Sequence, residues 1–138
     1  MEEERLCPFS KPIIGQWCRC PHARLAERCS GKMICSREED YRDSCIGLAD
    51  LLREKSRFVL GIAAEDEELT HAQLMRLRCG GLLGMQRILE LDVAEPPVVR
   101  GVMDAAEKQY GELSEFPFSE IVRDIKAFNH RRKVHDTK

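Results

Sequence analysis

The chain has 138 residues, of which 43% are hydrophobic and 33% charged, and its formal net charge is −2. This length and composition are typical of one soluble globular domain. The small negative charge and an aromatic content of only 6% argue against a nucleic-acid-binding surface, so we expect no nucleic-acid partner.

The N-terminal residues argue against export. The sequence begins Met1-Glu2-Glu3-Glu4, which is acidic where a secretory signal is basic, and no apolar stretch follows it. No apolar run approaches the ~20 residues that a membrane-spanning helix needs. We therefore expect a cytoplasmic protein without a membrane partner, in which cysteines stay reduced and serve as ligands or redox groups.

Residues 1–37 predict an irregular, cysteine-rich segment. Pro8 and Pro12 interrupt any early helix. Pro21 suits the first turn of a short helix over residues 22–28, and Gly31 could adopt the positive φ that ends it. A longer helix is expected to follow a capping box of Ser36 and Glu39 and to run to about residue 57.

Residues 58–130 predict more helices. The apolar run at 58–62 indicates a buried helix end and linker, with a strand as the alternative. The acidic run at 65–68 indicates a solvated loop. Thr70 and Gln73 form the next capping box, for a helix over residues 71–92. Two further helices are expected at 98–113 and 119–130, the last capped by Ser119.

Three glycines, Gly80, Gly81 and Gly84, fall in the middle of the predicted helix 71–92. Each costs about 1 kcal/mol relative to alanine in a helix interior. We interpret them as a place where another helix, or a cofactor, approaches the backbone closely.

The predicted fold is mainly α, a single domain over residues 1–138 with about four helices. Residues 1–37 would form the metal-binding segment, 38–130 the helical bundle and 131–138 a basic tail. The sequence leaves the oligomeric state open, with a homo-oligomer as one option.

Five of the seven cysteines lie within 28 residues, in the pattern C-x-C-x8-C-x5-C-x9-C. Thiolates favour zinc, copper(I) and iron–sulfur clusters, and four ligands are the usual requirement. The predicted ligands are Cys18, Cys20, Cys29 and Cys35, with Cys45 as the alternative fourth ligand. The C-x-C spacing differs from a zinc knuckle and favours an iron–sulfur cluster, of the 4Fe–4S type or alternatively 2Fe–2S, over zinc.

Three other residues offer donor atoms. We expect Cys7 to be an exposed thiol or a spare ligand, and His22 a solvated side chain or a mixed ligand. Cys79 is either a small packing residue or a thiol that faces the cluster.

The stretch from Cys18 to Met33 resembles the opening of the CDGSH-type 2Fe–2S motif of the mitoNEET-like proteins. That family spaces its three cysteines as Cys18, Cys20 and Cys29 are spaced here. Its fourth ligand, a histidine, falls on Met33, and its aspartate falls on Ser30, so Cys35 would have to replace the histidine. That family's fold is rich in strands, whereas this sequence is mainly helical, and we do not assign the chain to it.

The sequence supports three functional hypotheses. The first is a small iron–sulfur protein that transfers electrons or senses redox state, with a redox protein as partner. The second is a zinc-stabilised helical interaction module, and the third a metal-free redox thiol protein. We recognise no catalytic motif, which disfavours an enzyme.

Overall fold

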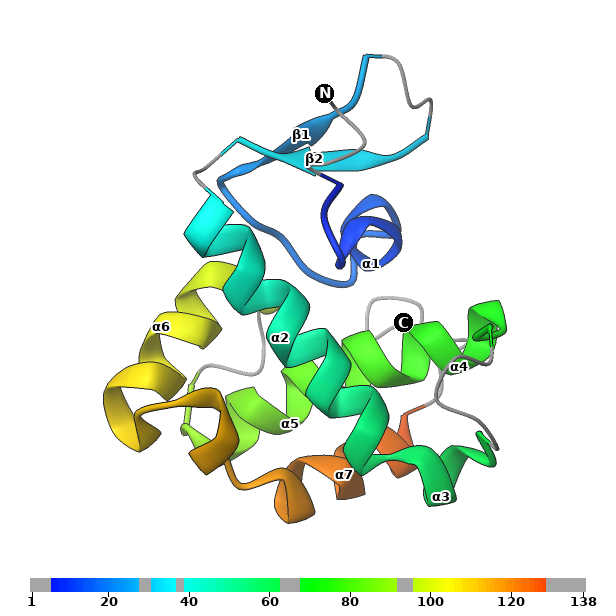
Figure 1. Cartoon of the computed structure of the whole chain (residues 1–138), viewed down its shortest axis with the longest axis vertical. Coiled ribbons are helices and arrows are strands. Elements are labelled where there is room, and N and C mark those ends of the chain that lie inside the picture. The colour runs from blue at the N-terminus through cyan, green and yellow to red at the C-terminus, as the bar shows by residue number, and fades with distance from the viewer. Residues whose placement is uncertain (1–5, 28–30, 37–38, 63–67, 92–95, 129–138) are drawn as a thin grey trace, which may run out of the picture.

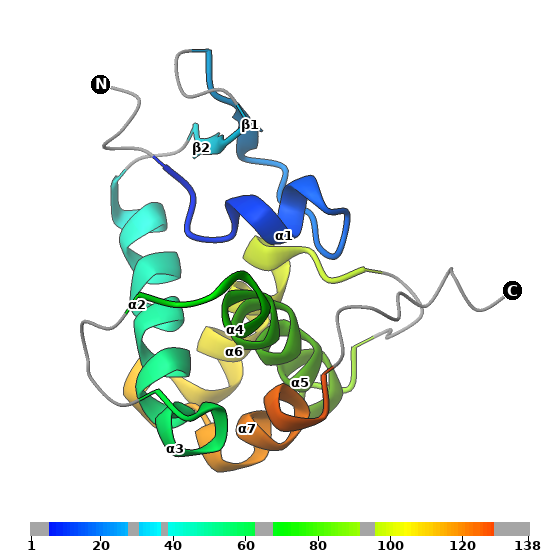
Figure 2. The ribbon, with the colours of Figure 1, turned by 90° about the vertical axis from the view of Figure 1, so that its right-hand side faces the viewer.

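The computed structural model describes residues 6–27, 31–36, 39–62, 68–91 and 96–128. The chain is mainly α, as predicted. Figures 1 and 2 show a small hairpin and a short helix over one end of a body of helices, next to the starts of α2 and α6. Among the described residues, none of the helices is both long and apolar enough to cross a bilayer.

The N-terminal layer consists of helix α1 (Ser10–Ile14) and strands β1 (Ala23–Leu25) and β2 (Met33–Cys35). The strands pair antiparallel, with Ala23 opposite Cys35 and Leu25 opposite Met33. The prediction of a helix over residues 22–28 is therefore wrong.

Tertiary contacts explain this strand pairing. Seven residues make an unstable helix on their own, whereas the central residue of β2, Ile34, is fully buried and also forms a β-bridge with Leu6. Gly31 does take a positive φ of 75°, but it precedes β2 rather than ending a helix.

Helix α2 (Glu39–Lys55) ends two residues before its predicted end, and the short α3 (Arg57–Leu60) follows it. Ser56, between them, is completely buried. The apolar run after it is not buried as a whole: Ile62 is buried, but Phe58 is fully exposed. The predicted acidic loop lies mostly outside the described residues.

The predicted helix 71–92 is confirmed as a continuous helical stretch to Ile88. It consists of α4 (His71–Met75), a π-helical turn η2 (Arg76–Gly80) and α5 (Gly81–Ile88). Thr70 and Gln73 form the predicted capping box, with the Gln73 backbone N–H donating to Thr70 Oγ1 at 3.1 Å. The π-helical turn was not predicted.

The glycines of this stretch are packed tightly, as the sequence indicates. A Cβ on Gly80 would lie 2.8 Å from Ile125 Cα, and one on Gly84 would lie 3.1 Å from Asp124 Cβ. On Gly81 it would lie 2.7 Å from a Leu52 methyl group. The close neighbours are therefore α2 and the last helix, not a cofactor.

The chain continues with α6 (Val99–Tyr110), a 3₁₀ turn η3 (Leu113–Glu115) and α7 (Phe118–Ala127). Helix α6 ends before its predicted end, at Gly111, whose φ is 89°. Ser119 is not the N-cap of α7, because the helix begins one residue before it. The predicted basic tail lies outside the described residues.

One buried cluster joins the N-terminal layer to the helices. Phe9 and Cys18 belong to the same apolar core as Leu48, Leu77 and Ile125. Trp17 also meets Phe128 edge to face, with ring centroids 5.1 Å apart. These contacts pack the cysteine-rich segment against the helical body without involving a metal.

The glycine packing gives a stability prediction. Gly80→Ala should lower the free energy of unfolding by about 1–3 kcal/mol, because the new methyl group meets α7 backbone atoms that cannot move independently. Urea denaturation followed by circular dichroism measures this. The matched control is Gly101→Ala in α6, where the nearest atom lies at 3.7 Å and helix propensity favours alanine. Equal effects of the two substitutions would contradict the packing argument.

Candidate metal centre

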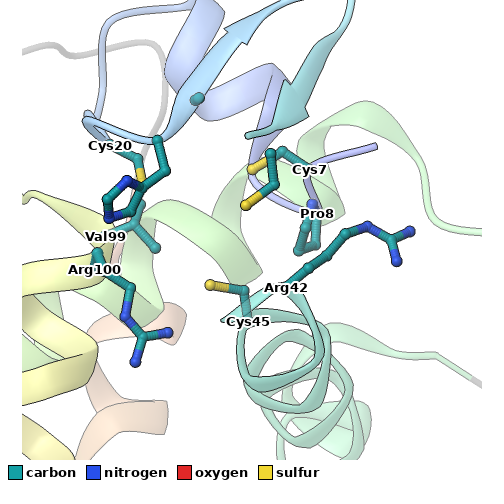
Figure 3. A pocket seen from close by; sticks show the side chains of 10 residues that line it. Cys7, Pro8, Cys20, Arg42, Cys45, Val99 and Arg100 are labelled. Carbon is teal, nitrogen blue, oxygen red and sulfur yellow. The ribbon is translucent and has the colours of Figure 1, made fainter. Parts of the chain in front are cut away.

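Four cysteines line one cavity between the N-terminal layer and the helical body. The cavity is small: its volume is about 20 Å³, enough for about one water molecule. Figure 3 shows the labelled thiols of Cys7, Cys20 and Cys45 around the same space. The complete lining is Cys7, Pro8, Cys20, His22, Ala23, Cys35, Arg42, Cys45, Val99 and Arg100.

Cys7 is held by hydrogen bonds on both sides. Its backbone N–H donates to Met33 O at 3.0 Å, and its carbonyl accepts from the Ser10 N–H at 3.0 Å. The Arg42 Nε–H of α2 donates to the carbonyl of the preceding residue, Leu6, at 2.9 Å. The segment that carries Cys7 is therefore fastened to both β2 and α2.

Cys20 is held at the start of α6. The neighbouring Arg19 donates its backbone N–H to Pro97 O at 2.9 Å and accepts from the Val99 N–H at 2.7 Å. The Cys20 carbonyl then accepts from the Ala23 N–H at 3.1 Å, where β1 begins. The C-x-C segment is thus bonded to residues almost eighty positions away.

The remaining two thiols come from regular elements. Cys35 is the last residue of β2, opposite Ala23 of β1. Cys45 lies in the second turn of α2. The four thiols are therefore supplied by four separate segments, which only the tertiary structure brings together.

Two arginines place positive charge around the cavity. Arg42 lies on α2 and Arg100 in the first turn of α6, and both line the cavity. Asp104 and Glu107 hold the Arg100 guanidinium, with N–O distances of 2.8 and 3.4 Å. These two carboxylates offset the charge of Arg100, so the positive charge beside the cavity comes from Arg42 and from the N-terminal end of α6.

Burial and hydrogen bonding act on these thiols in opposite directions. Burial raises the pKa of Cys7 to about 12, while the Phe9 backbone N–H, which donates to its Sγ at 3.4 Å, acts to lower it. Burial likewise raises the pKa of Cys45 to about 11, and the Arg100 guanidinium acts to lower it. Without a metal, both thiols are protonated at neutral pH, but each has a donor that would stabilise a thiolate.

The arrangement does not suit a single metal ion as it stands. A tetrahedral zinc with Zn–S bonds of about 2.3 Å places its sulfur ligands about 3.8 Å apart. In the part of the chain that the structure describes, no three Cys, His, Asp or Glu side chains are grouped closely enough to hold one ion.

The cavity differs from the predicted ligand set. It brings together Cys20, Cys35 and the alternative ligand Cys45, and adds His22. Cys29 lies outside the described residues. Cys7, expected to be exposed or spare, is partly buried and lines the cavity. Sequence spacing did not include Cys7 in the ligand set, because it lies outside the cluster of five cysteines. The pairing of Leu6 with β2 brings Cys7 close to the other cavity thiols.

Cys18 and Cys79 form a different group. They are 1% and 3% exposed, respectively, and neither lines the cavity of the four thiols. Burial raises the pKa of Cys18, and the nearby Cys79 thiol raises it further. Cys18 thus lies in the core, where it contributes to packing.

Comparisons of the chain with protein-family models, curated proteins and solved structures gave no match. The functional argument therefore depends on the cavity and its charges.

The raised pKa values predict how the stability of the metal-free, reduced protein depends on pH. The folded state holds the Cys7 and Cys45 protons more tightly than the unfolded state, whose thiols titrate near 9.0. Their contribution is fully present below pH 9 and is lost as the pH rises through 11 to 12. Cys45→Ser should remove part of this loss, on the order of 2 kcal/mol. Urea denaturation at several pH values measures it, and identical pH dependence in both proteins would contradict the burial of this thiol.

Proposed function

We propose that the chain binds an iron–sulfur cluster through Cys7, Cys20, Cys35 and Cys45 and uses it to transfer single electrons or to sense redox state. The observation that carries this proposal is the convergence of four thiols from four segments on one cavity. Soft sulfur donors of this number are the ligands of a 4Fe–4S or 2Fe–2S cluster.

The spacing of the donors is our ground for preferring a cluster to zinc. In a 4Fe–4S cluster each thiolate binds a different iron, so the four sulfur atoms stay farther apart than around one zinc ion. No close group of three donors lies among the described residues, which disfavours a single zinc ion in this arrangement. Of the two cluster types, we propose 4Fe–4S.

The charge around the cavity supports the same choice. A cluster bound by four thiolates is anionic, and Arg42 and the start of α6 would offset part of that charge, whereas Arg100 is already paired with Asp104 and Glu107. The hydrogen bond from the Phe9 N–H to Cys7 Sγ is of the kind that raises a cluster's reduction potential. A bound cluster would supply one-electron redox chemistry. The chain would supply its thiolate ligands and the electrostatic surroundings that set its reduction potential. We propose the cytoplasm as its location, because free thiols are stable there.

The test is anaerobic reconstitution of the chelated, reduced protein with ferrous iron and sulfide. We expect about four iron and four sulfide per chain for a 4Fe–4S cluster, with visible absorption that dithionite bleaches. A colourless protein that takes up one zinc and no sulfide would support the zinc-stabilised module. A metal-free protein with reversibly cycling thiols would support the redox thiol protein. Either outcome would overturn the cluster.

Two single substitutions test the ligand set. Cys7→Ser should abolish cluster assembly, because it removes one of the four cavity thiols, whereas Cys29→Ser should leave the iron and sulfide content unchanged. Iron and sulfide analysis after reconstitution measures both, and circular dichroism checks that each variant is folded. The reverse result, with assembly lost only in Cys29→Ser, would restore the ligand set predicted from the sequence spacing.

A further inference from the structure

A surface groove adjoins the cavity of the four thiols and shares Cys20 with it. We call it the Arg19 groove. Residues of segment 13–21 line one part of it, and Pro96 and Val98 line the rest. Its volume is about 940 Å³, and it is open to solvent. Sites for small molecules commonly have volumes of about 300–1,000 Å³, so the groove is large enough for such a ligand.

The two sides of the groove are joined by backbone hydrogen bonds. The Arg19 N–H donates to Pro97 O at 2.9 Å, and the Arg19 carbonyl accepts from the Val99 N–H at 2.7 Å. Cys18, which also lines the groove, is 1% exposed and belongs to the apolar core. The groove is therefore formed by the fold itself, and a ligand would not have to order its walls.

The groove combines an apolar lining with a single charge. Its apolar lining includes Ile13, Pro21, Pro96 and Val98, and Val98 is 38% exposed. Among the described residues that line it, Arg19 is the only charged one and none is aromatic. Arg19 is exposed, and its planar guanidinium has five N–H donors, two of which can bind one carboxylate side by side. The lining thus suits an aliphatic group next to one negative charge.

A second polar side chain stands in the same lining. Gln16 is exposed and takes a positive φ of 66°, which is uncommon for a residue other than glycine. Its amide can both donate and accept a hydrogen bond, so it could add a contact to a carboxylate bound at Arg19. Residues in this region of φ are found preferentially at functional sites.

We propose that the Arg19 groove binds an amphipathic monocarboxylate, a small molecule with an aliphatic body and one carboxylate group. The carboxylate pairs with the Arg19 guanidinium, and the aliphatic body covers the apolar lining. An extended peptide is disfavoured, because Pro21 and Pro96 have no backbone N–H and the backbone groups of Arg19 are already bonded. The inference uses the groove alone and does not depend on the proposed function.

The experiment titrates the reduced, metal-free, ¹⁵N-labelled protein with octanoate, kept below its micelle concentration. Amide chemical shifts should move for residues 16–20 and Val98, and their dependence on concentration gives the Kd. Arg19→Gln should weaken octanoate binding about tenfold, because a hydrogen-bonded charge pair is lost. The neutral probe 1-octanol should bind wild type about tenfold more weakly than octanoate, and Arg19→Gln should change its Kd less than about twofold.

The matched control is Arg24→Gln, which removes the same charge from an exposed residue of β1 that does not line the groove. It should change the Kd of octanoate less than about twofold. The spectrum of each variant without ligand shows whether it is folded. Shifts that map away from the groove, equal affinity for octanoate and 1-octanol, or equal effects of Arg19→Gln and Arg24→Gln would overturn the site. A failed cluster reconstitution would leave it standing.

Discussion

The position of the four cavity thiols depends on a few hydrogen bonds between distant parts of the chain. Arg19 bonds to Pro97 and Val99, and Leu6 accepts from Arg42 of α2. These bonds act together with the core packing of Phe9 and Cys18 to fix the C-x-C segment and the N-terminal segment relative to the helices. With them, thiols from a loop, a strand and a helix reach one cavity, and the start of α6 brings Arg100 beside Cys45.

The helical body provides the base on which this layer is fixed. Gly80 and Gly84 let α7 approach the long helical stretch to within van der Waals contact, which leaves no room for a cofactor there. Phe9 and Cys18 then insert into the same core. The N-terminal layer can therefore hold its shape through ordinary packing, and binding of the proposed cluster would add to a stability that the apolar core already supplies.

The helical part of the fold could be predicted from the sequence because its signals are local. The Thr70–Gln73 capping box and the glycine spacing depend on residues a few positions apart. The hairpin could not be predicted in this way. Its strand β2 depends on the burial of Ile34 and on the bridge from Ile34 to Leu6, which lies outside residues 22–28. The same limit applies to the site: Cys20, Cys35 and Cys45 were found from their density, whereas Cys7 joins them through a bridge between Leu6 and Ile34 that no spacing rule predicts.

Ligands so far apart in sequence have a consequence for folding. Cys7 and Cys45 are separated by 38 positions, so a cluster cannot bind all four thiols until the hairpin has docked on α2. Binding energy at such a site is then available to the docked state alone, and it favours that state over an undocked layer. A zinc knuckle, whose ligands lie within one turn, would order only its own loop. A site assembled from four segments would instead couple the proposed redox centre to the docking of the N-terminal layer on the helical body.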